Sequence, residues 1–196
     1  LILFGGVSSE HDVSVVSARS VIENTPKDKY NIILVGITKD GRWLKYDGDP
    51  SRLPEDKWLE DTDNLTKAIV SPDRCDHGIL VFGKDGVEKI RIDVAFPVLH
   101  GKNGEDGTIQ GFLQVAGIPF VGCDMISSAC CMDKVMTNTL ADAAGIPQAK
   151  WLGLKRYDYD KNSEEGLKKA EEYLGFPIFV KPANAGSSVG VSKAVD

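Results

Sequence analysis

A lysine followed by a loop of small residues lies near the end of the 196-residue chain. The stretch reads FVKPANAGSSVG, in which Lys181 ends an apolar run and Gly186, Ser187 and Ser188 follow it. Glycine and serine let backbone N–H groups approach phosphate oxygens closely, and an ammonium group neutralises part of the phosphate charge. The residue types and their spacing therefore indicate a phosphate-binding loop.

The order of residues differs from that of the common P-loop, in which the lysine follows the glycines and a helix begins. Here Lys181 precedes the loop, and Val189, Val191, Lys193 and Val195 recur at every second position, as is typical of a strand. We expect a loop that joins two strands and covers a nucleotide, with Lys181 directed to the phosphates. A plain hairpin with an exposed lysine explains this stretch equally well.

Three further side chains could take part in the same chemistry. Lys134, in a predicted helix, would add a second cation. His100 ends a buried strand and enters the loop GKNGEDG, and Glu10 begins a helix where it could hold a substrate ammonium. Each also has a structural explanation: a solvated helix face, a histidine bound to loop backbone, and a carboxylate favoured at a helix N-terminus by up to ~1 kcal/mol. Taken singly, the three patterns favour the structural explanations.

Alternating strands and helices in residues 1–124 predict the frame that positions these side chains. The expected strands cover residues 1–6, 30–38, 94–100 and 118–122, and the expected helices cover residues 10–24 and 108–117. This alternation predicts an α/β fold with a doubly wound, mostly parallel sheet. Ligands bind such sheets at the carboxyl ends of the strands, where the loops 5–9 and 101–107 fall.

The first helix and the connecting segments carry more detailed expectations. Ser9 and Asp12 have the spacing of a capping box at the helix start. The apolar residues expected on the buried face of this helix are Val13, Val15, Val16, Val21 and Ile22. Hairpins are expected where residues 42–47 follow the second strand and within residues 78–93. Residues 47–75 are polar and irregular, so we expect a loop there with a short helix near Trp58.

The pattern changes from about Ser127, and we predict two domains, 1–124 and 125–196. The second is expected to contain a long helix ended by Gly145, a strand at 148–156, a charged helix at 163–175, and strands at 177–182 and 187–195. This part has too little chain to enclose a core. We therefore expect residues beyond about 130 to be mobile or domain-swapped.

Composition excludes several classes of function. The net charge is −6 and no run of lysine and arginine is present, which argues against nucleic acid and anionic membrane as partners. No apolar run is long enough to span a bilayer. The cysteines at 75, 123, 130 and 131 match no zinc spacing and are expected to be reduced thiols, with Cys75 and His77 in a surface turn.

Five stretches in this order carry a family resemblance: FGGVSSEHDVS, PVLHGKNGEDGTIQG, GIPFVGCD, SSACCMDK and FVKPANAGSSVG. Together they resemble the D-alanine–D-alanine ligase family of the ATP-grasp superfamily over nearly the whole chain. The segment HGKNGEDGTIQG is the most specific, whereas KPANAGSS alone indicates only an ATP-grasp protein. The resemblance implies a pre-ATP-grasp domain followed by the first part of an ATP-grasp domain.

The resemblance also implies a reaction. ATP phosphorylates the carboxylate of one D-alanine, and the amino group of a second attacks the acylphosphate to give D-alanyl-D-alanine for peptidoglycan. The implied cofactors are ATP with Mg²⁺ or Mn²⁺. The implied setting is the bacterial cytoplasm, with a homodimer formed through the amino-terminal domain.

Roles follow for the residues that match the family motifs. Glu10 matches the catalytic carboxylate that holds the amino group of the first D-alanine, and His100 matches the histidine near that substrate. The residues that match the nucleotide and phosphate site are Lys134, Lys181, Gly186, Ser187 and Ser188, with Ser187 also matching the catalytic serine of the acylphosphate site. Ala185 departs from the pattern, because many members have glutamate there.

The family extends beyond the segments found here, so the resemblance implies an amino-terminal fragment without turnover of its own. The carboxyl-terminal half is expected to supply the metal ligands, the lid and the arginine that stabilises the transferring charge. No metal ligand is expected in this chain. The alternatives are a resistance-type ligase that takes D-serine or D-lactate second, and a non-catalytic binding module derived from the ligase. The segment HGKNGEDG argues against another carboxylate–amine ligase of the superfamily.

Overall fold

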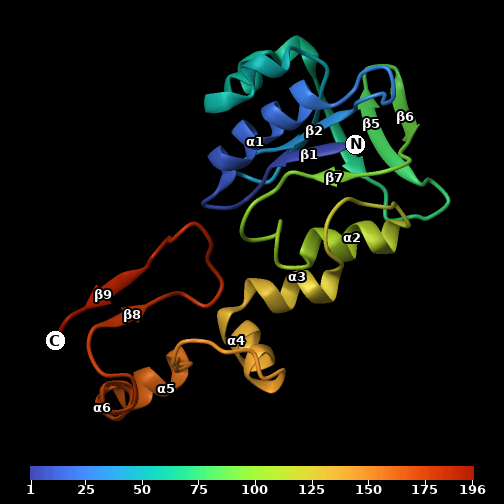
Figure 1. Cartoon of the computed structure of the whole chain (residues 1–196). Helices are drawn as coiled ribbons and strands as arrows, with labels where there is room; N and C mark the ends of the chain where they lie inside the picture. Colours follow the sequence, from blue (N-terminus) through green and yellow to red (C-terminus); the bar gives the residue numbers. More distant parts are fainter. The chain divides into compact units, whose positions relative to one another are not determined.

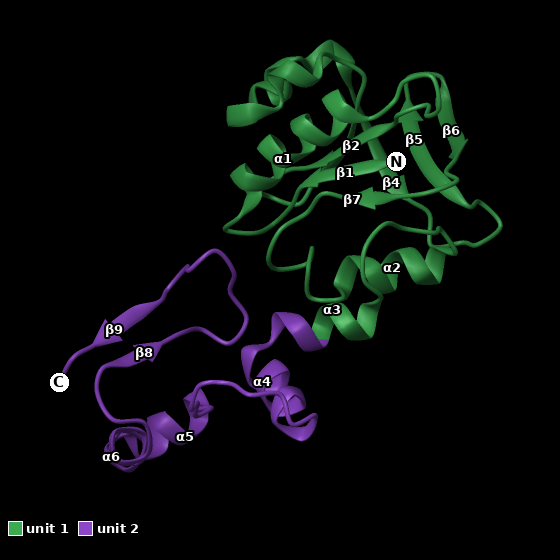
Figure 2. Cartoon of the chain, in the orientation of Figure 1, with its two compact units in different colours: residues 1–129 green, residues 130–196 purple.

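The computed structural model describes all residues from 1 to 196, and the chain divides into two units. Unit 1 comprises residues 1–129 and unit 2 comprises residues 130–196 (Figure 2). The helix α3 (Met125–Met132) contains the division. The domain boundary at 124/125, taken from the change in sequence pattern, stays a prediction.

A seven-stranded sheet forms the centre of unit 1, in the order β6-β5-β4-β3-β2-β1-β7. Its strands are β1 (Ile2–Gly5), β2 (Leu34–Ile37), β3 (Trp43–Tyr46), β4 (Leu65–Val70), β5 (Gly78–Gly83), β6 (Gly86–Arg91) and β7 (Phe96–Pro97). The predicted α/β class is confirmed. Parallel pairing joins β1 to β2 and to β7, and the remaining pairs are antiparallel, including both expected hairpins. In place of the strand expected at 118–122, Phe120 forms a single parallel bridge with Ala95.

Helices cover both faces of the parallel part of the sheet, so the sheet is doubly wound (Figure 1). Alternate residues of β1 point to opposite faces, as the pleat of a strand requires. Ile2 and Phe4 pack with α1 (His11–Asn24), whereas Leu3 packs with α2 (Thr108–Ala116). Unit 1 therefore has two apolar cores that share one sheet.

The buried face of α1 is partly polar, which corrects the expectation from its valines. Val13 and Val16 are 48% and 54% exposed, and the buried residues of the helix are His11, Ser14, Val15, Ala18 and Ile22. Ser14 is buried because its hydroxyl accepts a hydrogen bond from the Gly5 N–H at 2.7 Å and donates one to the Val98 carbonyl. The hydroxyl thereby ties the end of β1 to the segment after β7.

The helix α1 begins without the expected capping box. Glu10 is the N-cap residue, and its own side chain accepts no capping hydrogen bond. Instead the Ser8 hydroxyl accepts a hydrogen bond from the Glu10 N–H at 3.1 Å. The serine one position earlier than predicted therefore orders the entry to the helix.

The segment between the two hairpins is more ordered than its polar composition suggests. It forms three short 3₁₀ helices, η1 (Pro50–Arg52), η2 (Pro54–Glu60) and η3 (Thr62–Asn64), and then β4. Trp58 of η2 is fully buried and packs edge-to-face on Phe4 and Tyr46, with ring centroids 5.0 and 5.9 Å away. Gly36 lies under the same indole, where an added Cβ would be 2.4 Å from a ring carbon. The helix expected near Trp58 is thus η2, and its Trp58 side chain covers the apolar core.

Unit 2 contains α4 (Lys134–Ala143), α5 (Arg156–Lys161), α6 (Ser163–Leu174) and the antiparallel pair β8 (Ile178–Val180) and β9 (Ser192–Ala194). The prediction of a single helix before Gly145 is wrong, because Asp133 separates α3 from α4. The Asp133 carboxylate accepts hydrogen bonds from the N–H groups of Val135 and Met136 and so begins α4. The strand expected at 148–156 does not form either, whereas the last helix and hairpin are confirmed.

Every residue of unit 2 is at least partly exposed. The mobility expected beyond residue 130 stays a prediction. Across both units, no helix has the length and apolar character needed to cross a membrane.

Candidate functional site

The predicted site residues fall into two groups, one in each unit, and each group is described on its own. In unit 1, the loop after β1 and the loop 101–107 lie against each other. Glu10 is only 6% exposed, and its Oε2 lies beside Gly101, where an added Cβ would be 2.3 Å from that oxygen. Gly101 adopts the left-handed conformation with φ +67°. The predicted meeting of the two loops at one edge of the sheet is therefore found, with the Glu10 carboxylate between them.

His100 is held by α1 and by its own loop. Its Nε2 lies 3.1 Å from the hydroxyl of Ser17, and its Nδ1 lies 3.8 Å from Oε1 of Glu105. The other oxygen of Glu105 accepts a hydrogen bond from the Gly101 N–H at 2.7 Å. The imidazole is thus fixed by side chains, whereas the structural explanation from the sequence was a contact with loop backbone.

Asp106 fastens the end of the glycine-rich loop. Its carboxylate accepts hydrogen bonds from the N–H groups of Asn103 at 2.8 Å and Thr108 at 3.1 Å. Burial on its own would raise the pKa of Asp106, but these N–H groups outweigh burial and hold the pKa below its ordinary value. The ionised carboxylate therefore stabilises the loop that carries His100 and Gly101.

Replacing Asp106 with asparagine is expected to lower the free energy of unfolding by about 1–2 kcal/mol at pH 7, since hydrogen bonds to a charged acceptor are lost. A folded-state pKa below the unfolded value of about 3.9 means that this stabilisation is complete above that value. It is lost as the pH falls through the lower folded-state pKa. Urea unfolding from pH 7 to pH 3 should show wild type and Asp106→Asn converging in acid. A constant difference across this range would contradict the assignment.

Replacing Gly101 with alanine is expected to displace the Glu10 carboxylate and to destabilise unit 1 by about 1–2 kcal/mol from left-handed strain. Gly41→Ala is the matched control, because Gly41 also has a left-handed φ of +88° and an added Cβ would meet only Val7 at an ordinary 3.4 Å. The side-chain carboxyl NMR signal of Glu10 should move in Gly101→Ala and stay in Gly41→Ala. An unmoved signal in both variants would show that Glu10 does not depend on this contact.

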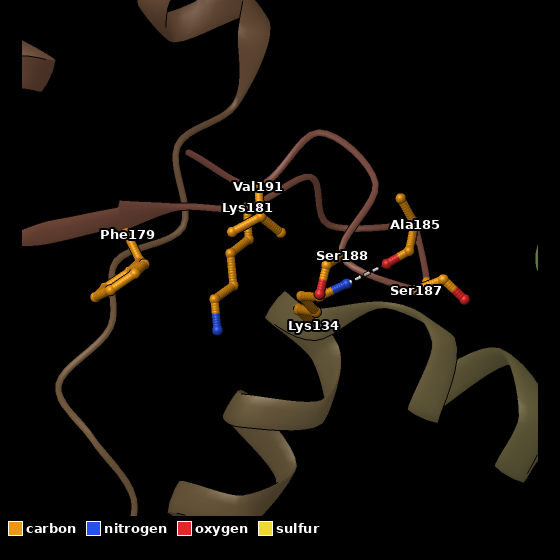
Figure 3. A pocket seen from close by; sticks show the side chains of 8 residues that line it. Lys134, Phe179, Lys181, Ala185, Ser187, Ser188 and Val191 are labelled. Atoms are coloured by element: carbon orange, nitrogen blue, oxygen red, sulfur yellow. Dashed lines mark hydrogen bonds between the residues drawn. The ribbon is translucent and has the colours of Figure 1, made fainter. Parts of the chain in front are cut away.

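The group in unit 2 surrounds one open cavity of about 370 Å³. The residues that line it are Lys134, Phe179, Lys181, Ala185, Gly186, Ser187, Ser188 and Val191 (Figure 3). All five residues predicted for the phosphate site are among them. The lining includes two lysines and no carboxylate, so the cavity has a positive charge that favours an anion.

The two lysines are positioned differently. Lys134 is the first residue of α4; its N–H donates to the Ala183 carbonyl at 3.0 Å, and its ammonium donates to the Ala185 carbonyl at 2.5 Å. Lys134 therefore ties the helix to the loop. Lys181 directly follows β8, and its side chain extends away from the loop in Figure 3. No hydrogen bond or ion pair holds its ammonium.

The loop between the lysine and β9 has a left-handed turn at its centre. Ser187 and Ser188 have φ of 49° and 60°, and the turn is closed by a hydrogen bond from the Val189 N–H to the Gly186 carbonyl at 3.0 Å. Left-handed backbone costs residues with a side chain roughly 1–2 kcal/mol each and is concentrated at binding sites. In a turn of this kind, successive backbone N–H groups can point to one side, as they do in anion-binding loops.

Ser8 and Ser17 are site residues that the sequence reasoning missed. Both contact the predicted residues: Ser8 bonds the backbone of Glu10, and Ser17 bonds His100. A signal was present for Ser17 only, because polar residues in EHDVSVVS recur at positions 10, 11, 14 and 17, the spacing of one helix face. The prediction instead put Val13 and Val16 on the buried face, where they do not lie.

The chain is similar to known proteins over both units. A model of the D-ala D-ala ligase N-terminus matches residues 1–123, and a model of the D-ala D-ala ligase C-terminus matches residues 140–196. The D-alanine–D-alanine ligase of Caldicellulosiruptor bescii is 48% identical over 195 residues, which are 100% of this chain and 52% of that protein.

Two solved structures are also similar. The VanG D-Ala:D-Ser ligase from Enterococcus faecalis has a TM-score of 0.87 and 44% identity, covering 100% of this chain and 55% of that one. The D-alanine–D-alanine ligase from Bacillus anthracis complexed with ATP has a TM-score of 0.59 and 31% identity, covering 100% and 49%. The chain spans about half the length of the curated relatives that it matches. With its first 123 residues matched by the family's amino-terminal model and its last 57 by the carboxyl-terminal one, the chain belongs to the D-alanine–D-alanine ligase family.

Proposed function

We propose that these residues supply the first-substrate site and part of the ATP site of an enzyme that joins two D-alanines. The observation that carries the proposal is the cavity of unit 2, where two lysines and a left-handed Gly-Ser-Ser turn surround a space without carboxylates. Such a donor set suits phosphate oxygens. The enzyme would use ATP to activate one carboxylate as an acylphosphate, which the second amino group attacks.

The chain's own residues would act as follows. Lys134 holds the loop in shape, while Lys181 brings a mobile positive charge to the transferring phosphate. The N–H groups and hydroxyls around Gly186, Ser187 and Ser188 cover the phosphate oxygens and keep out water, which would hydrolyse the acylphosphate. The contact from Lys134 uses the backbone carbonyl of Ala185, so it needs no side chain at that position.

In unit 1, Glu10 and His100 would hold the first D-alanine. The carboxylate of Glu10 would accept hydrogen bonds from the substrate ammonium. Because Glu10 is nearly buried between two loops, its carboxylate is also partly desolvated, which strengthens its attraction for a cation. Ser17 would fix the ring of His100 beside that substrate.

A divalent metal ion does not fit the donor set of this chain. Mg²⁺ prefers carboxylate oxygens, and the cavity of unit 2 has none among its lining residues. His11, Asp12 and Asp56 are close enough together for a metal, but the Lys39 ammonium lies 2.7 Å from Asp12 and 3.4 Å from Asp56. The lysine already occupies the position of a cation. We therefore assign no metal ligand and no metal-dependent step to these residues.

A ligase that takes D-serine as the second substrate is the alternative, and the 44% identity to the VanG D-Ala:D-Ser ligase is compatible with it. We further propose a cytoplasmic enzyme of peptidoglycan synthesis that forms a homodimer through its amino-terminal domain, without nucleic acid or membrane partners. The 196 residues alone are expected to give no turnover, because the cavity of unit 2 lacks metal ligands.

The test is phosphate release from ATP by the complete gene product that contains these residues. The assay would compare D-alanine, L-alanine, and D-alanine with D-serine, and mass spectrometry would identify the products. We expect release with D-alanine and formation of D-alanyl-D-alanine. A mixed D-Ala–D-Ser product would favour the alternative. Absence of any release dependent on a D-amino acid would overturn the proposal and favour a non-catalytic binding module.

A further inference from the structure

His11 is a buried histidine that the proposed chemistry leaves without a role. It is 1% exposed and belongs to the first turn of α1, next to Glu10. Its Nδ1 lies 2.8 Å from the Gly6 carbonyl oxygen, and its Nε2 lies 2.9 Å from Oδ1 of Asp56. When the carboxyl group of Asp56 is ionised, both of these oxygen atoms can accept hydrogen bonds but cannot donate them. Each ring nitrogen of His11 therefore faces an acceptor.

A neutral imidazole has one N–H donor and one lone pair, so either neutral tautomer would direct a lone pair at an acceptor. With the ring excluded from water, that arrangement would leave a buried polar atom unsatisfied, which costs about 1–3 kcal/mol. The imidazolium ion donates to both oxygens. The contacts of His11 thus require the doubly protonated ring.

The charges around His11 support the same form. Asp56 of η2 faces the ring directly, and Asp12 of α1 lies close by. The single nearby cation is Lys39, in the turn after β2, which bonds Asp12 and the far oxygen of Asp56. The carboxylates of Asp12 and Asp56 and the ammonium of Lys39 therefore lie near the imidazole, and a positive ring brings the sum of these charges to zero.

Asp56 is held in an unusual backbone conformation that directs its carboxylate to this contact. Glu55 and Asp56 both have positive φ, of 61° and 56°. The Oδ1 atom of Asp56 also accepts a hydrogen bond from the Trp58 indole at 3.2 Å. Such strain persists only where the surrounding contacts determine it, and it points to a constrained role for the carboxylate.

We propose that His11 is a positioning residue: as an imidazolium, it fastens the loop 6–10 to η2 and so holds the Glu10 carboxylate in place. The Gly6 carbonyl is the first group of that loop, and the same peptide segment ends at Glu10. The consequence for D-alanine binding rests on the function proposed above. The protonation state and the fastening of the loop do not.

The first measurement is the ¹⁵N NMR pattern of the imidazole nitrogens in the 196-residue chain at pH 7. The chain has three histidines, so the signal that disappears in His11→Gln identifies His11. We expect both His11 nitrogens to show the protonated pattern. In Asp56→Asn, which removes the facing charge, a smaller fraction of His11 should be doubly protonated. A wild-type signal with one unprotonated nitrogen would overturn the proposal, and this outcome needs no variant to fold.

The second measurement is amide hydrogen exchange. His11→Gln should speed exchange at residues 6–10 by about tenfold or more, while the amides of Leu3 and Phe4 in β1 keep their protection. His77→Asn is the control, because His77 directly precedes β5, outside α1 and the loop 6–10, and asparagine tolerates its left-handed φ of 45°. Unchanged exchange in His11→Gln would also overturn the proposal. If the complete gene product shows no ligase activity while the imidazolium signature is found, only the link to D-alanine fails.

Discussion

Replacing Trp58 with alanine is expected to lower the free energy of unfolding of unit 1 by about 3–5 kcal/mol, the range for a large aromatic residue removed from a core. The indole is fully buried, contacts Phe4 and Tyr46 edge-to-face, and fills the space above Gly36. Domains have a total stability of about 5–15 kcal/mol, so this one change could remove much of it. Urea unfolding followed by circular dichroism measures the loss without relying on tryptophan fluorescence.

Trp151→Ala is the matched control for this effect. Trp151 lies in unit 2, is only partly buried, and donates its indole N–H to an exposed Asp142 carboxylate at 2.9 Å. We expect the unfolding of unit 1 to change by less than about 0.5 kcal/mol in this variant. Trp58→Phe provides a milder test if the alanine variant fails to fold. A loss below about 1 kcal/mol for Trp58→Ala would show that η2 does not cover the core in solution.

Replacing Lys181 with methionine is expected to lower the kcat of the complete gene product by about 10²–10³-fold, as for other groups that stabilise transition-state charge. The Lys134 ammonium is bound to the Ala185 carbonyl, whereas no hydrogen bond or ion pair holds the Lys181 ammonium at the edge of the cavity. Lys181 is therefore the cation that can follow the charge of the transferring phosphate. Phosphate release from ATP with D-alanine, measured over a range of ATP concentrations, separates the effect on kcat from the effect on KM.

Lys193→Met is the control on the same hairpin. Lys193 is opposite Phe179 in the β8–β9 pair, with its ammonium 5.8 Å from the centre of that ring, and it does not line the cavity. This variant removes the same charge from the same unit and should keep kcat within about threefold. Equal losses in the two variants would mean that the general charge of the hairpin matters, and that Lys181 has no specific place on the phosphate.

The sequence predicted much of the fold because its signals there are local. An apolar run ended by glycine identified β1, an apolar run identified β2, and turn residues identified the hairpin of β5 and β6. The strand β4 was missed because Thr66 and Lys67 interrupt its apolar pattern, and it is recruited by pairing with β3 and β5. Likewise, no local pattern distinguishes one helix from two at Asp133, since aspartate can cap a helix or lie on its surface.

The candidate site was predictable to the extent that its residues lie in glycine-rich motifs. All five residues of the phosphate group line one cavity, and Glu10 and the loop after His100 are in contact. The supporting contacts were not predictable in the same way. The contact of Ser17 with His100 and the contact of Asp56 with His11 depend on which segments the fold brings against α1. His11 and Asp56 are 45 residues apart along the chain. Such pairings are set by tertiary structure, which a single sequence does not show.

The burial of both faces of the sheet has a consequence for how β1 and β2 align. In a sheet with one solvent-exposed face, a strand whose pairing shifts by one residue exposes its apolar side chains to water, and this cost alone disfavours the shifted register. Here a slipped strand would still meet an apolar core on either side. Volume must decide instead: Phe4 pairs with Gly36, and only the missing side chain at Gly36 leaves room for the indole. The register of these two strands is therefore encoded by the size of one residue.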